Sequence, residues 1–182
     1  MRLMPRILAA LAALFVLSTP LAAQEPSGTV LTVSGDIGNT NRGRFDQFHD
    51  GLLNYHGKSF EKAFEFDRAA LAAMPQQSIT ANAEPWSEPL RMEGPKLADV
   101  LAAAGAAGKP ITVYAIDGYG AAMTVDQIAA HEWVLALKTN GKPLGIGGRG
   151  PLWLAYDTGS GKATAEQEGA WVWSIFHIEV GE

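Results

Sequence analysis

Apolar positions recur every three or four residues in several short stretches of the chain. Phe45, Phe48, Leu52 and Tyr55 keep this spacing, which places them on one face of a helix. Asp67 is suited to cap a second helix. The predicted helices are short and cover residues 45–55, 68–74, 97–104 and 125–130, the last opened by a capping-box pattern at Thr124 and Gln127.

Other stretches alternate apolar and polar positions, as strands do. The β-branched run Ile111–Ile116 predicts a central strand, and Asn140 with Gly141 predicts a tight turn. The predicted strands cover residues 29–33, 60–66, 77–81, 111–116, 133–138, 152–156 and 171–180. Because strands outnumber helices and do not alternate regularly with long ones, the predicted class is α+β, with mixed or antiparallel β-sheets and short helices.

The first residues predict a signal peptide. Arg2 and Arg6 precede an apolar run over residues 7–17, and the short side chains of residues 18–23 suit signal peptidase. The run is about half of the roughly 20 residues that a membrane span needs, and a short uncleaved anchor is the alternative. We expect a signal peptide over residues 1–23 and a single periplasmic domain over residues 24–182, not embedded in the membrane after cleavage.

Composition narrows the classes of partner and chemistry. The chain has no cysteine, which rules out disulfides and thiolate chemistry and leaves a core with five tryptophans to stabilise the fold. Two of the 14 basic residues lie in the signal, so 12 basic residues face 19 acidic ones and the net charge becomes −7. Such a surface disfavours nucleic acid and anionic lipid as partners.

Several short motifs match known sequence patterns but lack the structural context that the corresponding function needs. The segment 145–150 satisfies G-x-G-x-x-G, but Pro151 and a strand follow it instead of a helix, so we interpret it as a flexible loop, a candidate pocket rim. The four histidines lack the spacing of a metal site, and no serine lies in a G-x-S-x-G elbow. We therefore predict no metal ligands and no catalytic residues.

Six segments together resemble the oxidoreductase molybdopterin-binding, sulfite-oxidase-like domain family. That family has a strand, a C-x-E-x-W-S-like segment and then G-x-x-L-x-x-L-L at the start of a helix. In this chain Asn82-Ala83-Glu84-Pro85-Trp86-Ser87 and Gly94-Pro95-Lys96-Leu97 occupy these places. The matching segments span most of the mature chain, in the family's order: residues 78–87, 93–101, 115–119, 135–144, 150–154 and 171–180.

The chain departs from this family at the metal ligand. The family's molybdenum-ligating cysteine falls at Asn82, and a carboxamide is a poor ligand for a soft metal-thiolate centre. Arg2 and Arg6 are also not a twin-arginine signal, so we expect the chain to be exported unfolded, without a cofactor inserted in the cytoplasm. The chain is similar to the metal-free branch of the family. That resemblance implies a periplasmic pterin-binding protein that reports to a membrane-bound signalling partner.

Seven residues are candidates for holding a pterin, which needs an aromatic face and a few fixed polar groups. Alternatives remain for five of them: Trp86 as plain core, Asp117 as part of a turn with Tyr119 packed beneath it, Asn41 as a helix cap, Arg42 in solvent. Arg149 is held between glycines that fix its position poorly. The candidate residues are Asn41, Arg42, Asn82, Trp86, Asp117, Tyr119 and Arg149.

Three functions follow from these observations. The first is non-catalytic binding of a metal-free pterin in the periplasm, reported to a membrane signalling protein. The second is a molybdopterin-dependent oxidoreductase in which the dithiolene alone holds the metal. The third is an interaction module without a pocket, which would use the amphipathic segment between Asn39 and Phe66 as its contact surface.

Overall fold

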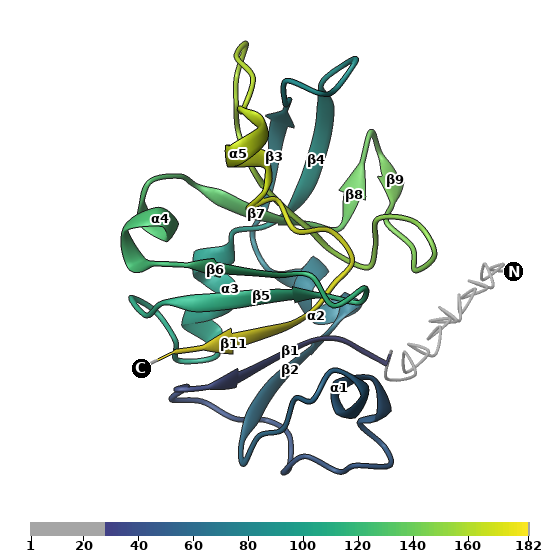
Figure 1. Cartoon of the computed structure of the whole chain (residues 1–182), viewed down its shortest axis with the longest axis vertical. Coiled ribbons are helices and arrows are strands. Elements are labelled where there is room, and N and C mark those ends of the chain that lie inside the picture. Colours follow the sequence, from purple (N-terminus) through teal and green to yellow (C-terminus); the bar gives the residue numbers. More distant parts are fainter. Residues whose placement is uncertain (1–27, 182) are drawn as a thin grey trace, which may run out of the picture.

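The computed structural model describes residues 28–181, which form an α+β fold with three β-sheets and five short helices (Figure 1). The predicted signal peptide lies outside the described residues. Within them, no helix is long and apolar enough to cross a membrane. The predicted class, with mixed and antiparallel sheets and short helices, is confirmed.

The largest sheet has five strands and is mixed. Its order is β2-β1-β11-β5-β6, where only the pair β1 and β11 is parallel. The strand predicted over Ile111–Ile116 is β5, which lies inside the sheet between β11 and β6, so its predicted central position is confirmed. The strands are β1 (Thr29–Gly35), β2 (Ala63–Asp67), β5 (Ile111–Ala115), β6 (Gly120–Met123) and β11 (Ile175–Val180).

Two smaller antiparallel sheets lie beside it, above the five-stranded sheet in the view of Figure 1. One has the order β3-β4-β8-β9, and the other pairs β10 with β7. The predicted turn joins β8 to β9, where Asn140 and Gly141 both have positive φ. The strands are β3 (Gln76–Ala81), β4 (Leu90–Pro95), β7 (Trp133–Ala136), β8 (Lys138–Thr139), β9 (Lys142–Pro143) and β10 (Trp153–Tyr156).

The crossing of β4 over β7 depends on Gly94. A Cβ atom at this position would overlap the carbonyl oxygen of Leu135 in β7. Only glycine lets two backbones approach so closely. The two smaller sheets are thereby held against each other, and the loop that follows β3 stays next to the start of β10.

The helices are short, and side chains cap the N-termini of three of them. Asp67 accepts a hydrogen bond from the backbone N–H of Ala70, as predicted for the second helix. Thr124 and Gln127 form the predicted capping box. The helices are α1 (Gly51–Tyr55), α2 (Arg68–Ala73), α3 (Leu97–Ala103), α4 (Val125–Ala129) and α5 (Ala165–Glu168).

Aromatic side chains make up much of the core. Trp133, Trp153 and Trp171 are buried in the main hydrophobic cluster, and Trp86 packs against it. A smaller cluster under α1 contains Phe60 and Phe176. The predicted contribution of tryptophan to the core is confirmed for these four indoles, which remove apolar area from water, and is wrong for Trp173, which is 39% exposed.

Several predicted element boundaries are wrong. The helix predicted over residues 45–55 begins only at Gly51, because Asp46 accepts hydrogen bonds from the N–H groups of Phe48 and His49 and forms a local turn instead. The strand predicted over 60–66 begins at Ala63. The final strand begins at Ile175, because Ser174 has a φ of 54° and interrupts the extended chain.

Candidate functional site

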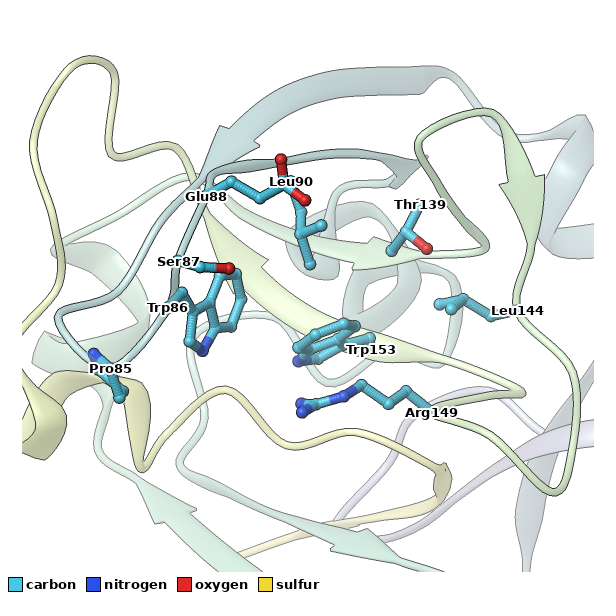
Figure 2. A pocket seen from close by; sticks show the side chains of 9 residues that line it. All are labelled: Pro85, Trp86, Ser87, Glu88, Leu90, Thr139, Leu144, Arg149 and Trp153. Atoms are coloured by element: carbon cyan, nitrogen blue, oxygen red, sulfur yellow. The ribbon is translucent and has the colours of Figure 1, made fainter.

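Two of the predicted residues, Trp86 and Arg149, line a cavity of about 550 Å³ (Figure 2). We call it the Arg149 cavity. Trp86 comes from the loop between β3 and β4, Arg149 from the glycine-rich loop before β10, and Trp153 from the start of β10. Figure 2 shows the Arg149 side chain alongside Trp153, with Trp86 nearby. The remaining lining residues are Pro85, Ser87, Glu88, Leu90, Thr139 and Leu144.

Arg149 places a positive charge against two aromatic rings. Its guanidinium carbon lies 4.6 Å from the ring centroid of Trp153 and 5.6 Å from that of Trp173. Its carbonyl oxygen accepts a hydrogen bond from the Ser174 N–H at 3.0 Å, so its backbone is better fixed than the flanking glycines indicate. Within residues 28–181, no carboxylate forms an ion pair with Arg149. The charge is therefore available to an anionic group.

Trp86 packs against the core and also contacts a residue that lines a second, neighbouring cavity. Its ring centroid lies 5.4 Å from that of Trp153 and 5.5 Å from that of Trp171. Its Nε1 donates a hydrogen bond of 2.6 Å to Oε1 of Glu168. Trp86 thus belongs to the core, as its alternative interpretation held, and also forms part of the wall of the Arg149 cavity.

The sequence reasoning missed Glu168 because it missed helix α5. Thr164 and Gln167 form a capping box at the start of this helix, with the same spacing as the box recognised at Thr124 and Gln127. The signal was therefore present in the sequence. The box fixes the short helix that presents Glu168 to Trp86.

The second cavity, which we call the Tyr119 cavity, has a volume of about 260 Å³. It contains the predicted residues Asp117 and Tyr119. Asp117 Oδ1 accepts a hydrogen bond from the Tyr119 N–H at 3.0 Å, which confirms the predicted turn, and the Tyr119 hydroxyl donates one to the Gly169 carbonyl at 2.8 Å. The lining residues are Ala115, Asp117, Tyr119, Glu168, Gly169, Trp171, Val172 and Trp173.

Asn82 lies at the end of β3 but lines neither cavity. Its backbone N–H donates to Thr158 Oγ1, and its carbonyl oxygen accepts from the Ala163 N–H. Its side-chain Oδ1 is buried and has no hydrogen-bond partner. A buried acceptor without a partner is costly, and Asn82 carries one at the position that the family resemblance aligns with a metal ligand.

The donor set at Asn82 does not fit molybdenum. The chain has no cysteine, and among residues 28–181 no three His, Asp or Glu side chains form a group able to hold a metal ion. Soft metal centres favour thiolate ligands, and Asn82 offers only a carboxamide.

The structure places Asn41 and Arg42 outside both cavities. Asn41 uses both ends of its amide on the backbone of Glu65, donating at 2.9 Å and accepting at 2.7 Å. Arg42 forms an ion pair with Asp50, donates to Thr32 Oγ1 at 3.1 Å and lies over the Phe60 ring. Both side chains thus tie the first loop to the five-stranded sheet.

A buried polar cluster lies in the same sheet, also away from the cavities. His177 Nε2 and Ser34 Oγ are 2.9 Å apart, and Tyr114 stacks on the imidazole. Burial lowers the pKa of His177 to about 4. The hydrogen bond from Lys58 lowers the pKa of Glu179. These groups are neutral or paired at neutral pH and support the fold.

Comparison with known protein families finds no match, and neither does comparison with curated proteins. Among solved structures, the fold is similar to the crystal structure of the sulfane dehydrogenase SoxCD from Paracoccus pantotrophus. The TM-score is 0.55 at 17% sequence identity, and the match covers 82% of this chain. The chain spans 37% of the length of that chain. This likeness concerns the fold alone, and it supports the predicted sulfite-oxidase-type fold.

Proposed function

We propose that this protein binds a pterin without a metal in the two adjoining cavities, does not catalyse a reaction, and reports the ligand to a membrane-bound signalling protein in the periplasm. The observation that carries the proposal is the meeting of four predicted residues, Trp86, Asp117, Tyr119 and Arg149, at two neighbouring cavities. Their walls supply aromatic faces and only a few polar groups, which is the usual composition of a small-molecule site.

The chemistry of the two cavities differs in a way that suits a pterin with a side chain. The Tyr119 cavity is small, and its walls are indole and phenol rings and two carboxylates. The Arg149 cavity is larger and contains an unpaired cation. The pterin ring fits the first in size and polarity, and an anionic substituent fits the second.

Calorimetric titration of the mature protein with oxidised and reduced pterins tests the proposal. We expect saturable binding with a dissociation constant in the micromolar range or below. Trp86→Ala should weaken binding by about tenfold or more, since an aromatic wall contributes about 0.5–1.5 kcal/mol beyond its buried area. Tyr55→Ala is the matched control, because Tyr55 is exposed and lines neither cavity.

A specific surface favours a second candidate function, the interaction module. Phe48 is 87% exposed and Tyr55 is 83% exposed, although both residues are large and apolar. Together with Leu52 they form an apolar surface on and beside α1. If correctly folded protein binds no pterin at all, this surface becomes the better account of the function.

A further inference from the structure

Two carboxylates of the Tyr119 cavity each keep one oxygen that has no partner among the described residues. Glu168 uses Oε1 to accept from Trp86 Nε1, and Asp117 uses Oδ1 to accept from the Tyr119 N–H. Within residues 28–181, neither side chain forms an ion pair. Glu168 is half-buried, so its second oxygen gains most from a ligand that donates hydrogen bonds.

The same cavity wall holds a donor without an acceptor. Trp171 lines the cavity and is only 3% exposed, and its Nε1 has no hydrogen-bond partner. Buried indole N–H groups usually find an acceptor. This N–H is itself buried, so the two carboxylates are the polar groups that can face a ligand, and the Trp171 indole supplies an apolar wall.

The size of the cavity suits a small ligand. Its volume of about 260 Å³ lies below the roughly 300–1,000 Å³ of pockets for drug-sized ligands. Tyr119 and Trp173 are 51% and 39% exposed, so both rings keep surface on which a flat ligand can stack.

We propose that this cavity recognises a 2-amino-4-oxopyrimidine edge, with Glu168 as the main determinant of specificity. This inference rests on the proposed function and adds to it which edge of the pterin the protein recognises. The neighbouring ring N–H and amino group donate to Glu168 and Asp117. A 2,4-dioxo ring presents a carbonyl in place of the amino group and is rejected by the carboxylate.

The test compares pterin with lumazine, the same bicyclic ring with oxygen at C2. Wild-type protein should bind pterin about 10 to 100 times more tightly, because a hydrogen bond to a charged group contributes about 1.5–3 kcal/mol. Glu168→Gln should lower this ratio by about tenfold or more, and Asp117→Asn should lower it less. Both amides can still accept the hydrogen bonds from Trp86 Nε1 and the Tyr119 N–H, so the cavity wall is preserved.

Glu166→Gln is the control on the same helix, because Glu166 lines neither of the two cavities, and it should leave the ratio unchanged. Equal affinity of wild-type protein for pterin and lumazine would overturn this inference while leaving pterin binding intact. A failure of the folded protein to bind either ring would overturn the proposed function as well. Competition by free arginine at the concentrations at which pterin binds would show a guanidinium site, and would also overturn the inference.

Discussion

Arg42 and Arg149 are the same residue type in two regions of the molecule, and their surroundings differ completely. Arg42 is half-buried, pairs with Asp50 and lies 3.7 Å from Glu65. Arg149 is exposed, lies over two tryptophans and has no carboxylate partner in the described part of the chain. In the first region polar groups satisfy one another and stabilise the fold. Around the two cavities, polar groups remain available to bind a ligand.

Removing Arg42 should have the largest effect on stability. Arg42→Ala leaves the Asp50 carboxylate, whose side chain is only 8% exposed, without its partner. We expect the free energy of unfolding to fall by about 3 kcal/mol, as for other broken buried pairs. Urea unfolding monitored by circular dichroism measures it. An unchanged midpoint would contradict the stabilising role of Arg42, and a loss of pterin affinity in the folded variant would assign it to the site.

Acid should destabilise the same region through His177. Its folded pKa of about 4 lies below the unfolded value of about 6.5, so the neutral form is favoured in the native state. Its contribution is complete above pH 6.5 and is lost as the pH falls toward 4, by about 3 kcal/mol.

The pH dependence of unfolding in wild-type protein and in His177→Gln measures this loss. Because other groups titrate in both proteins, the difference between the two curves isolates His177. Parallel curves between pH 4 and 6.5 would contradict the prediction.

Removing Arg149 should leave stability nearly unchanged and alter binding. Its contacts with the Trp153 and Trp173 rings contribute at most about 1 kcal/mol at an exposed site. We expect Arg149→Ala to weaken binding of pterin-6-carboxylate about tenfold and binding of unsubstituted pterin much less. Arg149→Lys keeps the charge and should restore part of the difference. Equal losses for the two ligands would place the anionic group elsewhere.

The smallest effect is expected at Tyr119. Tyr119→Phe removes the exposed hydrogen bond to Gly169 and should cost about 0.5 kcal/mol of stability. Tyr119→Ala also removes the ring and should weaken pterin binding several-fold. Calorimetric titration of both variants separates the hydroxyl from the ring, and equal affinities of Tyr119→Ala and wild type would remove Tyr119 from the site.

Local signals in the sequence predicted most of the helices and strands. The Thr124 box, the Asp67 cap and the Asn140 turn depend on neighbours in the chain, so their residues alone are sufficient. Strand β4 contains Gly94 and Pro95 and was missed, because its pairing with β3 and β8 depends on tertiary contacts.

The assembly of the cavities could not be predicted from spacing. Trp86, Trp153 and Trp171 come from three separate segments and meet only in the folded chain. The contacts of Asn41 and Arg42 with Glu65 of β2 could not be predicted either, because they join residues far apart in sequence. The family resemblance supplied the fold and several site residues, but not their partners.

The close crossing at Gly94 limits how the sequence can vary. Any substitution there meets the backbone of Leu135, which no rotamer change in a neighbour can move aside. Descendants of this fold that retain the crossing must therefore retain glycine at this place, even where the rest of strand β4 has diverged.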